Sequence, residues 1–387
     1  MLPNPFQKPL TEFKDTDPLK NREIVRELLG PEGVHKYRKI LGDTSDPHSK
    51  RDKGVSKEEL LAMAAEARAK IDSLSRDSVG PILERLIEKG YASQIKSLKE
   101  IGFLEREPQK KKKGFTFFKS KESKESPSEK IGFTDIIGTF REVPSEEAIK
   151  NHFLAIPNIK QKIDQGFTRL LIVPFGSSLD SLREKMGELI KRHKKENKLL
   201  AEDGTELELD VAKPIFVWEG YDTEESTESL VYYPELFDSK NHNGKTKREL
   251  LSSSKFPGYN ILLIQDDTRI PRQKKGTSKS GRAQLEARKS PNDYLELLKS
   301  DPSYANEHGL TPEDWFTLFA TNLNQKNKVI NDWEPNEDSA NILVGSYFSE
   351  SGGIPNARWA RDFKQVDLSW QGASATNMEY GILSAVG

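Results

Sequence analysis

Histidine is the side chain best suited to bind metal or transfer protons near neutral pH, and the chain has 6 of them, scattered along its length. None has a second histidine at the i, i+4 spacing that places two ligands on one helix face. The absence of cysteine excludes disulfides, thiolate metal sites and cysteine-based catalysis. No Ser–His–Asp set or isolated carboxylate pair stands out. The sequence therefore assigns no catalytic residue, metal ligand or cofactor.

Two short basic segments contain residue types that hold anions. Gly244 to Thr246 reads GKT, like the end of a phosphate-binding loop, but Ser239 stands where such a loop needs its first glycine. We interpret this triplet as a turn. Residues 274–282 read KKGTSKSGR and could hold an anion through backbone amides and Arg282. The same composition is typical of a surface loop between a strand and a helix, which we favour.

Glu334, Pro335 and Asn336 form the triplet with which some C-type lectins bind calcium and sugar through carboxylate and carboxamide oxygens. Those lectins also use a Trp-Asn-Asp element further along the chain, which is missing here. Three residues alone are a weak motif, so calcium binding at this triplet stays open.

The composition limits the classes of partner. The 387 residues include 60 Lys+Arg and 61 Asp+Glu, so net charge gives no reason to expect nucleic acid or an anionic membrane. No apolar run approaches the length of a membrane span, and the first residues lack an apolar signal core. We expect the cytoplasm by default, although the sequence does not fix localisation or oligomeric state.

The N-terminal third reads as helices followed by a linker. Residues 56–74 begin with Ser56 as a candidate N-cap, and residues 78–104 continue with helical spacing that Gly80-Pro81 and Gly90 interrupt. We expect a helical hairpin there, serving as a docking or oligomerisation element or, alternatively, contacting nucleic acid. Residues 108–130 are rich in Lys and Glu and predict a mobile linker. The predicted division is 1–107, 108–130 and 131–387.

Helix and strand patterns mix after residue 131, which predicts an α+β domain. Ser290-Pro291 and Thr311-Pro312 each combine a hydroxyl N-cap with proline at the first helical position, so they mark helix starts. A capped helix near Ser145 and a long amphipathic helix over residues 177–200 are also predicted. Apolar runs rich in β-branched residues predict strands at 167–175, 213–221, 229–235 and 259–267.

The last segment, residues 345–387, combines a regular apolar set with small polar side chains of many kinds. It contains too many aromatic and β-branched residues to be a solvated terminus. Short strands whose exposed positions carry varied side chains would produce this pattern, and such a surface suits recognition. Its apolar members are Phe348, Ile354, Trp359, Val366, Leu368 and Trp370.

From about Gly166 to its end, the chain resembles the variable (target) proteins of diversity-generating retroelements. The resemblance lies in GFTRLLIVPFG, ELDVAKPIFVWEGY, LVYYPELF, NHNGKTKRELL, FPGYNILLIQDD, GLTPEDWFTLFATNL, GSYFSESGGIPNARWARDFKQVDLSW and the closing GILSAVG. In that closing segment Leu383 stands where the family usually has arginine.

The resemblance implies a C-type lectin fold of the formylglycine-generating-enzyme subtype, in which a final set of strands and loops displays variable residues. The family's mutagenic copying alters adenines in a template, so asparagine codons never become Trp, Met, Lys, Gln or Glu. On that basis Trp359, Lys364, Gln365, Trp370, Met378 and Glu379 belong to the frame, and we expect both tryptophans to be buried. Frame and variable positions alternate along residues 358–370, so we expect one face of these strands to point inward and the other outward. The implied ligand-binding positions are Asn356, Arg358, Ala360, Asp362, Phe363, Asp367, Ser369, Ser374, Ala375, Thr376 and Asn377.

The implied function is binding of an unknown protein or other macromolecule, without catalysis. The enzymes of this fold oxidise a substrate cysteine by means of their own cysteines, and a chain without cysteine cannot do so. We expect the implied positions to be exposed on one shallow surface, with Arg358 and Phe363 as its anchors. Two alternatives stay open: a structural or phage-associated module without diversification, and an enzyme with an unrecognised site.

Overall fold

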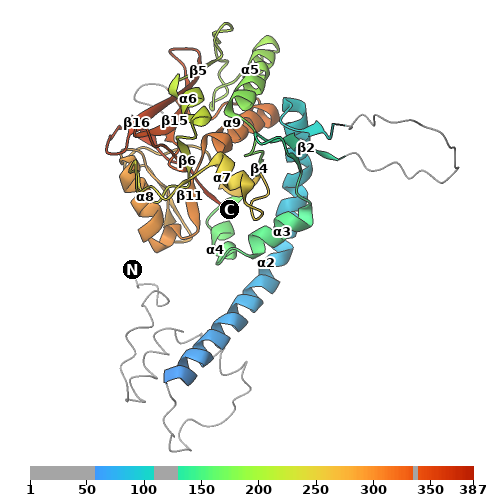
Figure 1. Ribbon diagram of the computed structural model, residues 1–387, viewed down its shortest axis with the longest axis vertical. Helices are drawn as coiled ribbons and strands as arrows, with labels where there is room; N and C mark the ends of the chain where they lie inside the picture. The colour runs from blue at the N-terminus through green and yellow to red at the C-terminus, as the bar shows by residue number, and fades with distance from the viewer. Residues whose placement is uncertain (1–56, 109–129, 334–338) are drawn as a thin grey trace, which may run out of the picture. The chain divides into compact units, whose positions relative to one another are not determined.

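The computed structural model describes residues 57–108, 130–333 and 339–387. The chain divides after Pro81 into two compact units, of which the second is Ile82–Gly387. This second unit is α+β, as predicted, with several sheets and packed helices (Figure 1). Within the described residues, no helix is long and apolar enough to cross a membrane.

The expected helical hairpin is instead one continuous helix, α2 (Lys57–Ile101), which includes Pro81. Gly90 does not break it. A Cβ on Gly90 would lie 3.1 Å from Cβ of Leu170, so this glycine lets the helix pack closely against a strand. The apolar side chains of its last part, including Leu83 and Leu98, are buried.

The predicted domain boundary at residues 108–130 also differs from the structure. β1 (Glu105–Arg106) pairs with β2 (Ile131–Thr134), which pairs with β3 (Phe140–Glu142). This sheet joins the two sides of the predicted linker, and residues 82–107 belong to the same compact unit as residues 131–387. The linker residues 109–129 themselves lie outside the described residues.

A four-stranded antiparallel sheet and two helices form one half of the core. Its strand order is β11-β18-β8-β4, and α5 packs on α9, which also contacts β4. Helix α9 is buried over most of its length, as expected for a helix between layers. The bounds are β4 (Phe167–Val173), α5 (Leu179–Lys195), β8 (Asn260–Gln265), β11 (Glu307–Gly309), α9 (Pro312–Lys326) and β18 (Ser384–Val386).

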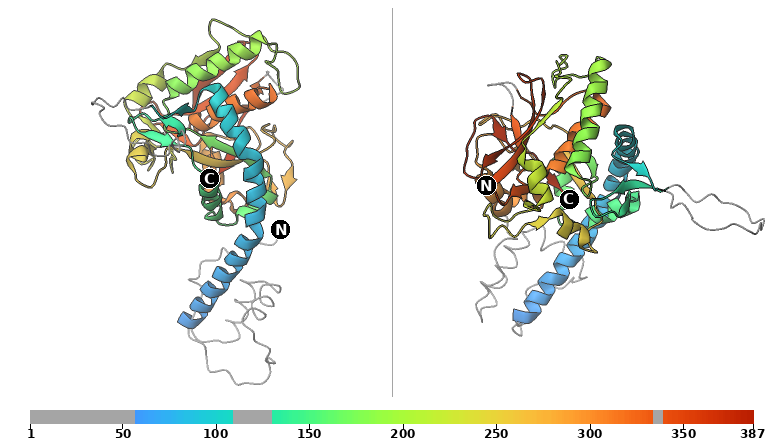
Figure 2. Two further views of the ribbon diagram at one scale, coloured as in Figure 1. Left: turned by 90° about the vertical axis from the view of Figure 1, so that its right-hand side faces the viewer. Right: turned by 45° about the horizontal axis from the view of Figure 1, so that its top comes forward.

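The second, nine-stranded sheet contains the segment predicted to be variable. Its path is β17-β13-β15-β14-β6-β7, with β12 and β16 also paired to β15, and β5 to β16. Figure 2 shows its last strands in red beside α9, which contacts β15. The bounds are β5 (Ile215–Val217), β6 (Leu230–Tyr232), β7 (Lys245–Thr246), β12 (Asp332–Trp333), β13 (Ala340–Ile342), β14 (Ser346–Phe348), β15 (Gly353–Ala360), β16 (Gln365–Gly372) and β17 (Tyr380–Gly381).

The predicted helix starts at Ser290-Pro291 and Thr311-Pro312 are confirmed, because each hydroxyl caps its helix in a reciprocal capping box. Thr246 caps a helix in the same way, so the GKT triplet forms a short strand (Lys245–Thr246) and the start of a helix rather than a phosphate loop. The remaining helices are α3 (Glu146–Leu154), α4 (Ile159–Asp164), α6 (Gly220–Ser226), α7 (Lys247–Ser252), α8 (Pro291–Ser300) and the 3-10 turn η2 (Pro302–Tyr304).

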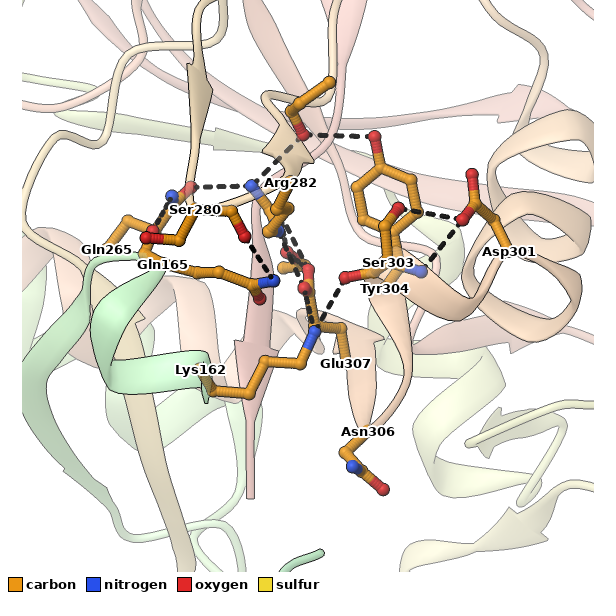
Figure 3. A network of polar contacts seen from close by, with 12 residues as sticks. Lys162, Gln165, Gln265, Ser280, Arg282, Asp301, Ser303, Tyr304, Asn306 and Glu307 are labelled. Atoms are coloured by element: carbon orange, nitrogen blue, oxygen red, sulfur yellow. Dashed lines mark hydrogen bonds and ion pairs between the residues drawn. The ribbon is translucent and has the colours of Figure 1, made fainter. Parts of the chain in front are cut away.

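A buried polar network fastens the closing strand β18. Lys162 and Arg282 both converge on the carboxylate of Glu307, at 2.7 Å, and Ser384 Oγ donates to the same group at 2.6 Å (Figure 3). Burial lowers the pKa of Lys162, although Glu307 opposes that shift. Arg282 begins β10 (Arg282–Ala283), which forms a tight hairpin with β9 (Ser278–Lys279). Since its side chain is 2% exposed and paired with Glu307, Arg282 is not available to the external anion that this loop was considered to hold.

Candidate ligand-binding surface

The strands β15 and β16 form an antiparallel hairpin whose register brings several predicted residues together. Asn356 pairs with Ser369, Arg358 with Asp367, and Ala360 with Gln365. Directly opposed residues of a pair project on the same side of a sheet. We call this side the Arg358 face. It consists of Ile354, Asn356, Arg358, Ala360, Gln365, Asp367, Ser369 and Gln371.

Arg358 lies at the centre of this face and is held from two directions. Its Nε and Nη2 donate to Oδ2 of Asp367 at 2.9 and 2.8 Å. The guanidinium carbon lies 4.0 Å from the ring centroid of Trp333, within the range of a cation–π contact. Both charged side chains are only 12% exposed. Arg358 is therefore mostly buried and presents a fixed edge to solvent instead of a free cation.

Two aromatic residues frame Arg358 on the side away from β16. Trp333 pairs with Ala360, and its Nε1 donates to Glu379 Oε2 at 3.0 Å. Tyr380 lies 5.9 Å from the guanidinium, and burial raises the pKa of its hydroxyl. These two rings and the ion pair are held in place before any partner binds. Aromatic residues and arginine are also the types enriched among the few interface residues that contribute most of the binding free energy.

The other end of the Arg358 face is closed by a hydrophobic cluster. Ile354 and Ile342 pack with Tyr294 and Leu298 of α8. Asn356 is 1% exposed, and its Oδ1 has no hydrogen-bond partner among the described residues. The face is thus partly open around Arg358 and covered where α8 lies.

The remaining predicted residues flank the hairpin. Asp362 and Phe363 lie in the turn between β15 and β16, and Phe363 is 58% exposed. Ser374 to Asn377 are exposed in the segment that follows β16. That segment leads to Tyr380, which pairs with Ala340 on β13, a neighbour of β15. It therefore returns along the sheet, from the Gly372 end of the hairpin toward the level of Arg358.

The expectation that all implied positions are exposed is wrong for Asn356, Ala360 and Asp367, which are 1%, 0% and 8% exposed. It is also wrong for Arg358, whose side chain is 12% exposed. The expected alternation of an inward and an outward face also fails on β15, where both faces are buried except at Arg358. The reason is that β15 is a central strand: α9 contacts the strand, and α8 and Trp333 cover the Arg358 face.

The two tryptophans of the predicted frame have different environments. Trp359 is 0% exposed, as expected, but Trp370 is 39% exposed, which contradicts the prediction that it is buried. β5 pairs with β16 only as far as Leu368, so the Trp370 ring lies beyond the covered part of the strand. It packs over Gly353, where a Cβ would lie 2.8 Å from the ring, and 5.6 Å from the Trp218 ring centroid.

Trp333 and Tyr380 are the residues of this surface that the sequence did not single out. Their contact with Arg358 depends on long-range pairing of β12 and β17, for which the sequence carries no local signal. Glu334-Pro335-Asn336 lies outside the described residues, and in the described ranges no three His, Cys, Asp or Glu side chains gather as a metal site.

Comparisons of the chain with protein-family models, curated proteins and solved structures found no significant match to any of them.

Proposed function

We propose that this protein binds a macromolecular partner through the Arg358 face and the two segments that flank it, residues 361–364 and 373–379. The observation that carries the proposal is the register of the hairpin, which brings Arg358, Asp367 and Ser369 onto one face beside Trp333 and Tyr380. Aromatic rings and an arginine around a partly desolvated centre are suited to protein recognition.

We further propose that the fold is C-type lectin-like, of the formylglycine-generating-enzyme subtype, and that a retroelement diversifies this surface. The support comes from the sequence resemblance, together with the fact that the tail 345–387 forms strands β14 to β18 of a packed framework. Asp362, Phe363 and Ser374 to Asn377 project from turns, where substitution leaves the sheet hydrogen bonds intact. In this account the protein recognises a partner and catalyses no reaction.

The experiment that tests diversification is sequencing of the native gene and its flanking DNA from many cells of one population. The proposal predicts a reverse transcriptase gene and a near-copy of the tail's coding sequence beside this gene. It also predicts substitutions at the codons of the flanking turns and of Arg358, Asp367 and Ser369, with Trp359 invariant. Uniform variation along the gene, or no variation in the tail, would contradict it.

A further inference from the structure

Residues 271–289, which we call the basic loop, connect the segment after β8 to the start of α8 and include the β9–β10 hairpin. The sequence of this loop contains a single carboxylate, Glu286, among many cations. Because the whole chain has a net charge of −1, the loop is a local concentration of positive charge. Its cationic residues are Arg272, Lys274, Lys275, Lys279, Arg282, Arg288 and Lys289.

The loop engages its carboxylate internally and leaves most of its cations at the surface. Glu286 accepts hydrogen bonds from the backbone amides of Lys274 at 2.8 Å and Gly276 at 2.9 Å. Arg282 is buried and paired with Glu307, so it does not contribute to the charge that a partner meets. The exposed cations of the loop are Lys274, Lys275, Lys279, Arg288 and Lys289.

Hydrogen bonds within the loop fasten its two ends to each other. Ala287 N donates to the Pro271 carbonyl at 2.8 Å, and Arg288 Nη1 donates to Gln273 Oε1 at 2.8 Å. Between these two contacts, β9 and β10 pair as an antiparallel hairpin. Since the exposed cations project from a fastened backbone, a partner that contacts them orders little of the loop on binding, which lowers the entropic cost of association.

The basic loop borders the Arg358 face on the side where Tyr380 lies. Arg288 N donates to the Tyr380 carbonyl at 2.9 Å. Arg272 Nη2 lies 3.9 Å from Glu379 Oε1, and Glu379 Oε2 accepts a hydrogen bond from Trp333 Nε1. Tyr380 and Trp333 are the two rings beside the guanidinium at the centre of the face. The loop therefore forms a basic rim along this edge of the candidate surface.

The carboxylates next to the loop offset only part of its charge. Asp293 accepts hydrogen bonds from N and Oγ of Ser290 at the start of α8, at 3.0 and 2.7 Å. Asp267, before the loop, is paired with Arg269 at 2.7 Å. Glu296, further along α8, is exposed. Because the exposed cations of the loop outnumber these carboxylates, the rim keeps an excess of positive charge.

We propose that the basic loop selects protein partners with an acidic surface. This inference rests on the proposed function and extends it: the loop lies outside the tail 345–387, so every variant of the tail would keep the same basic rim. Charges at the rim of an interface mainly accelerate association and set its salt dependence. Single-stranded nucleic acid fits less well, because base stacking needs open aromatic faces and the Arg358 guanidinium already lies over the Trp333 ring.

The test is fluorescence anisotropy of labelled poly-L-glutamate with the full chain, beside labelled oligothymidylate, at about 0.01 M and 0.15 M salt. Saturable binding of poly-L-glutamate is expected, with lower affinity at the higher salt because counter-ions screen exposed charges. Poly-L-glutamate has no aromatic side chain, so its binding reports on charge and is expected whether or not the Arg358 face binds a partner. Absence of saturable binding, or tighter binding of oligothymidylate, would overturn the inference.

Two matched variants separate the loop from the general charge of the protein. The loop variant combines Lys274→Gln, Lys275→Gln and Lys289→Gln. It should bind poly-L-glutamate about tenfold more weakly at the lower salt, because three modest surface ion pairs are lost together. The control variant removes the same charge from exposed positions around the end of α5 and should stay within about twofold of wild type; it combines Lys191→Gln, Lys195→Gln and Lys198→Gln. Equal affinities of the two variants, with both proteins folded by thermal unfolding, would overturn the inference.

Discussion

Arg358 and Asp367 face each other across β15 and β16, with Nη2 of the arginine 2.8 Å from Oδ2 of the aspartate. Both residues belong to the set implied by the family resemblance, so the surface proposed to vary contains a mostly buried ion pair at its centre. A substitution at one of these positions then affects the other, and the two are expected to change together.

A double-mutant cycle with Arg358→Met and Asp367→Asn measures the coupling free energy of this ion pair. Since each side chain is 12% exposed, we expect a coupling of about 1–2 kcal/mol in urea unfolding. The exposed pair Arg269–Asp267 provides a matched control, for which the coupling should stay within about 0.5 kcal/mol. Equal coupling in the two cycles would mean that the Arg358 pair is solvated like a surface pair.

The two tail tryptophans allow a comparison on one hairpin. Trp359→Ala is expected to lower the free energy of unfolding by about 3–5 kcal/mol, because it empties a fully buried site. Trp370→Ala is expected to cost about 1–2 kcal/mol, because the ring, which packs on Gly353 and Trp218, is 39% exposed. Denaturant melts measure both. A larger loss for Trp370→Ala would place that ring in the core after all.

Cleavage between β1 and β2 tests the revised domain boundary. A specific protease site inserted within residues 109–129 should yield two pieces that co-elute under native conditions, because β1 stays paired with β2 and α2 stays packed on β4. Under denaturing conditions the pieces should separate. Release of a folded C-terminal fragment in native buffer would instead show that a domain boundary lies near residue 107.

Stability should fall on mild acidification because of buried histidine. Burial lowers the pKa of His193, whose Nδ1 lies 3.0 Å from the Leu189 carbonyl, and it lowers the pKa of His152 as well. The unfolded chain then binds protons below about pH 6.5, where the folded state does not, so unfolding becomes easier as pH falls. Each histidine contributes a slope of at most about 1.4 kcal/mol per pH unit.

Urea melts between about pH 7.5 and 5.5 measure this dependence. His193→Gln keeps a neutral polar group and should flatten the curve, with the largest difference from wild type at the acidic end. Identical slopes for the variant and the wild type, or stability that rises as the pH falls, would show that His193 does not carry the effect.

The features that the sequence predicted correctly depend on residues close together in the chain. The starts of α8 and α9 depend on Ser290 and Thr311, whose capping residues lie within the next turn, and both predictions are confirmed. Glycine and proline also affect the backbone locally, but whether they interrupt a helix depends on the surrounding structure. Gly90 and Pro81 indicated a break, whereas α2 continues through both, and the missing Cβ of Gly90 allows close contact with Leu170.

The candidate surface depended on long-range pairing and was predicted only in part. Alternation along β15 assumed one solvated face, but a central strand between covering elements buries both, which removes Asn356 and Ala360 from the exposed set. The surface loop predicted for residues 274–282 contains the buried Arg282, and nothing local in the sequence shows that Glu307 lies beside it.

The central claim, that this tail is a recognition surface, is tested most directly by panning two display libraries against a panel of unrelated proteins. The first varies Asp362, Phe363, Ser369 and Ser374 to Asn377, with Arg358 and Asp367 varied together and the buried Asn356 and Ala360 kept. The second varies as many exposed residues on α5, including Glu184, Glu188, Lys191 and Lys195. The account predicts folded, target-specific binders from the first library alone. Equal yields from both libraries, or widespread unfolding in the first, would contradict it.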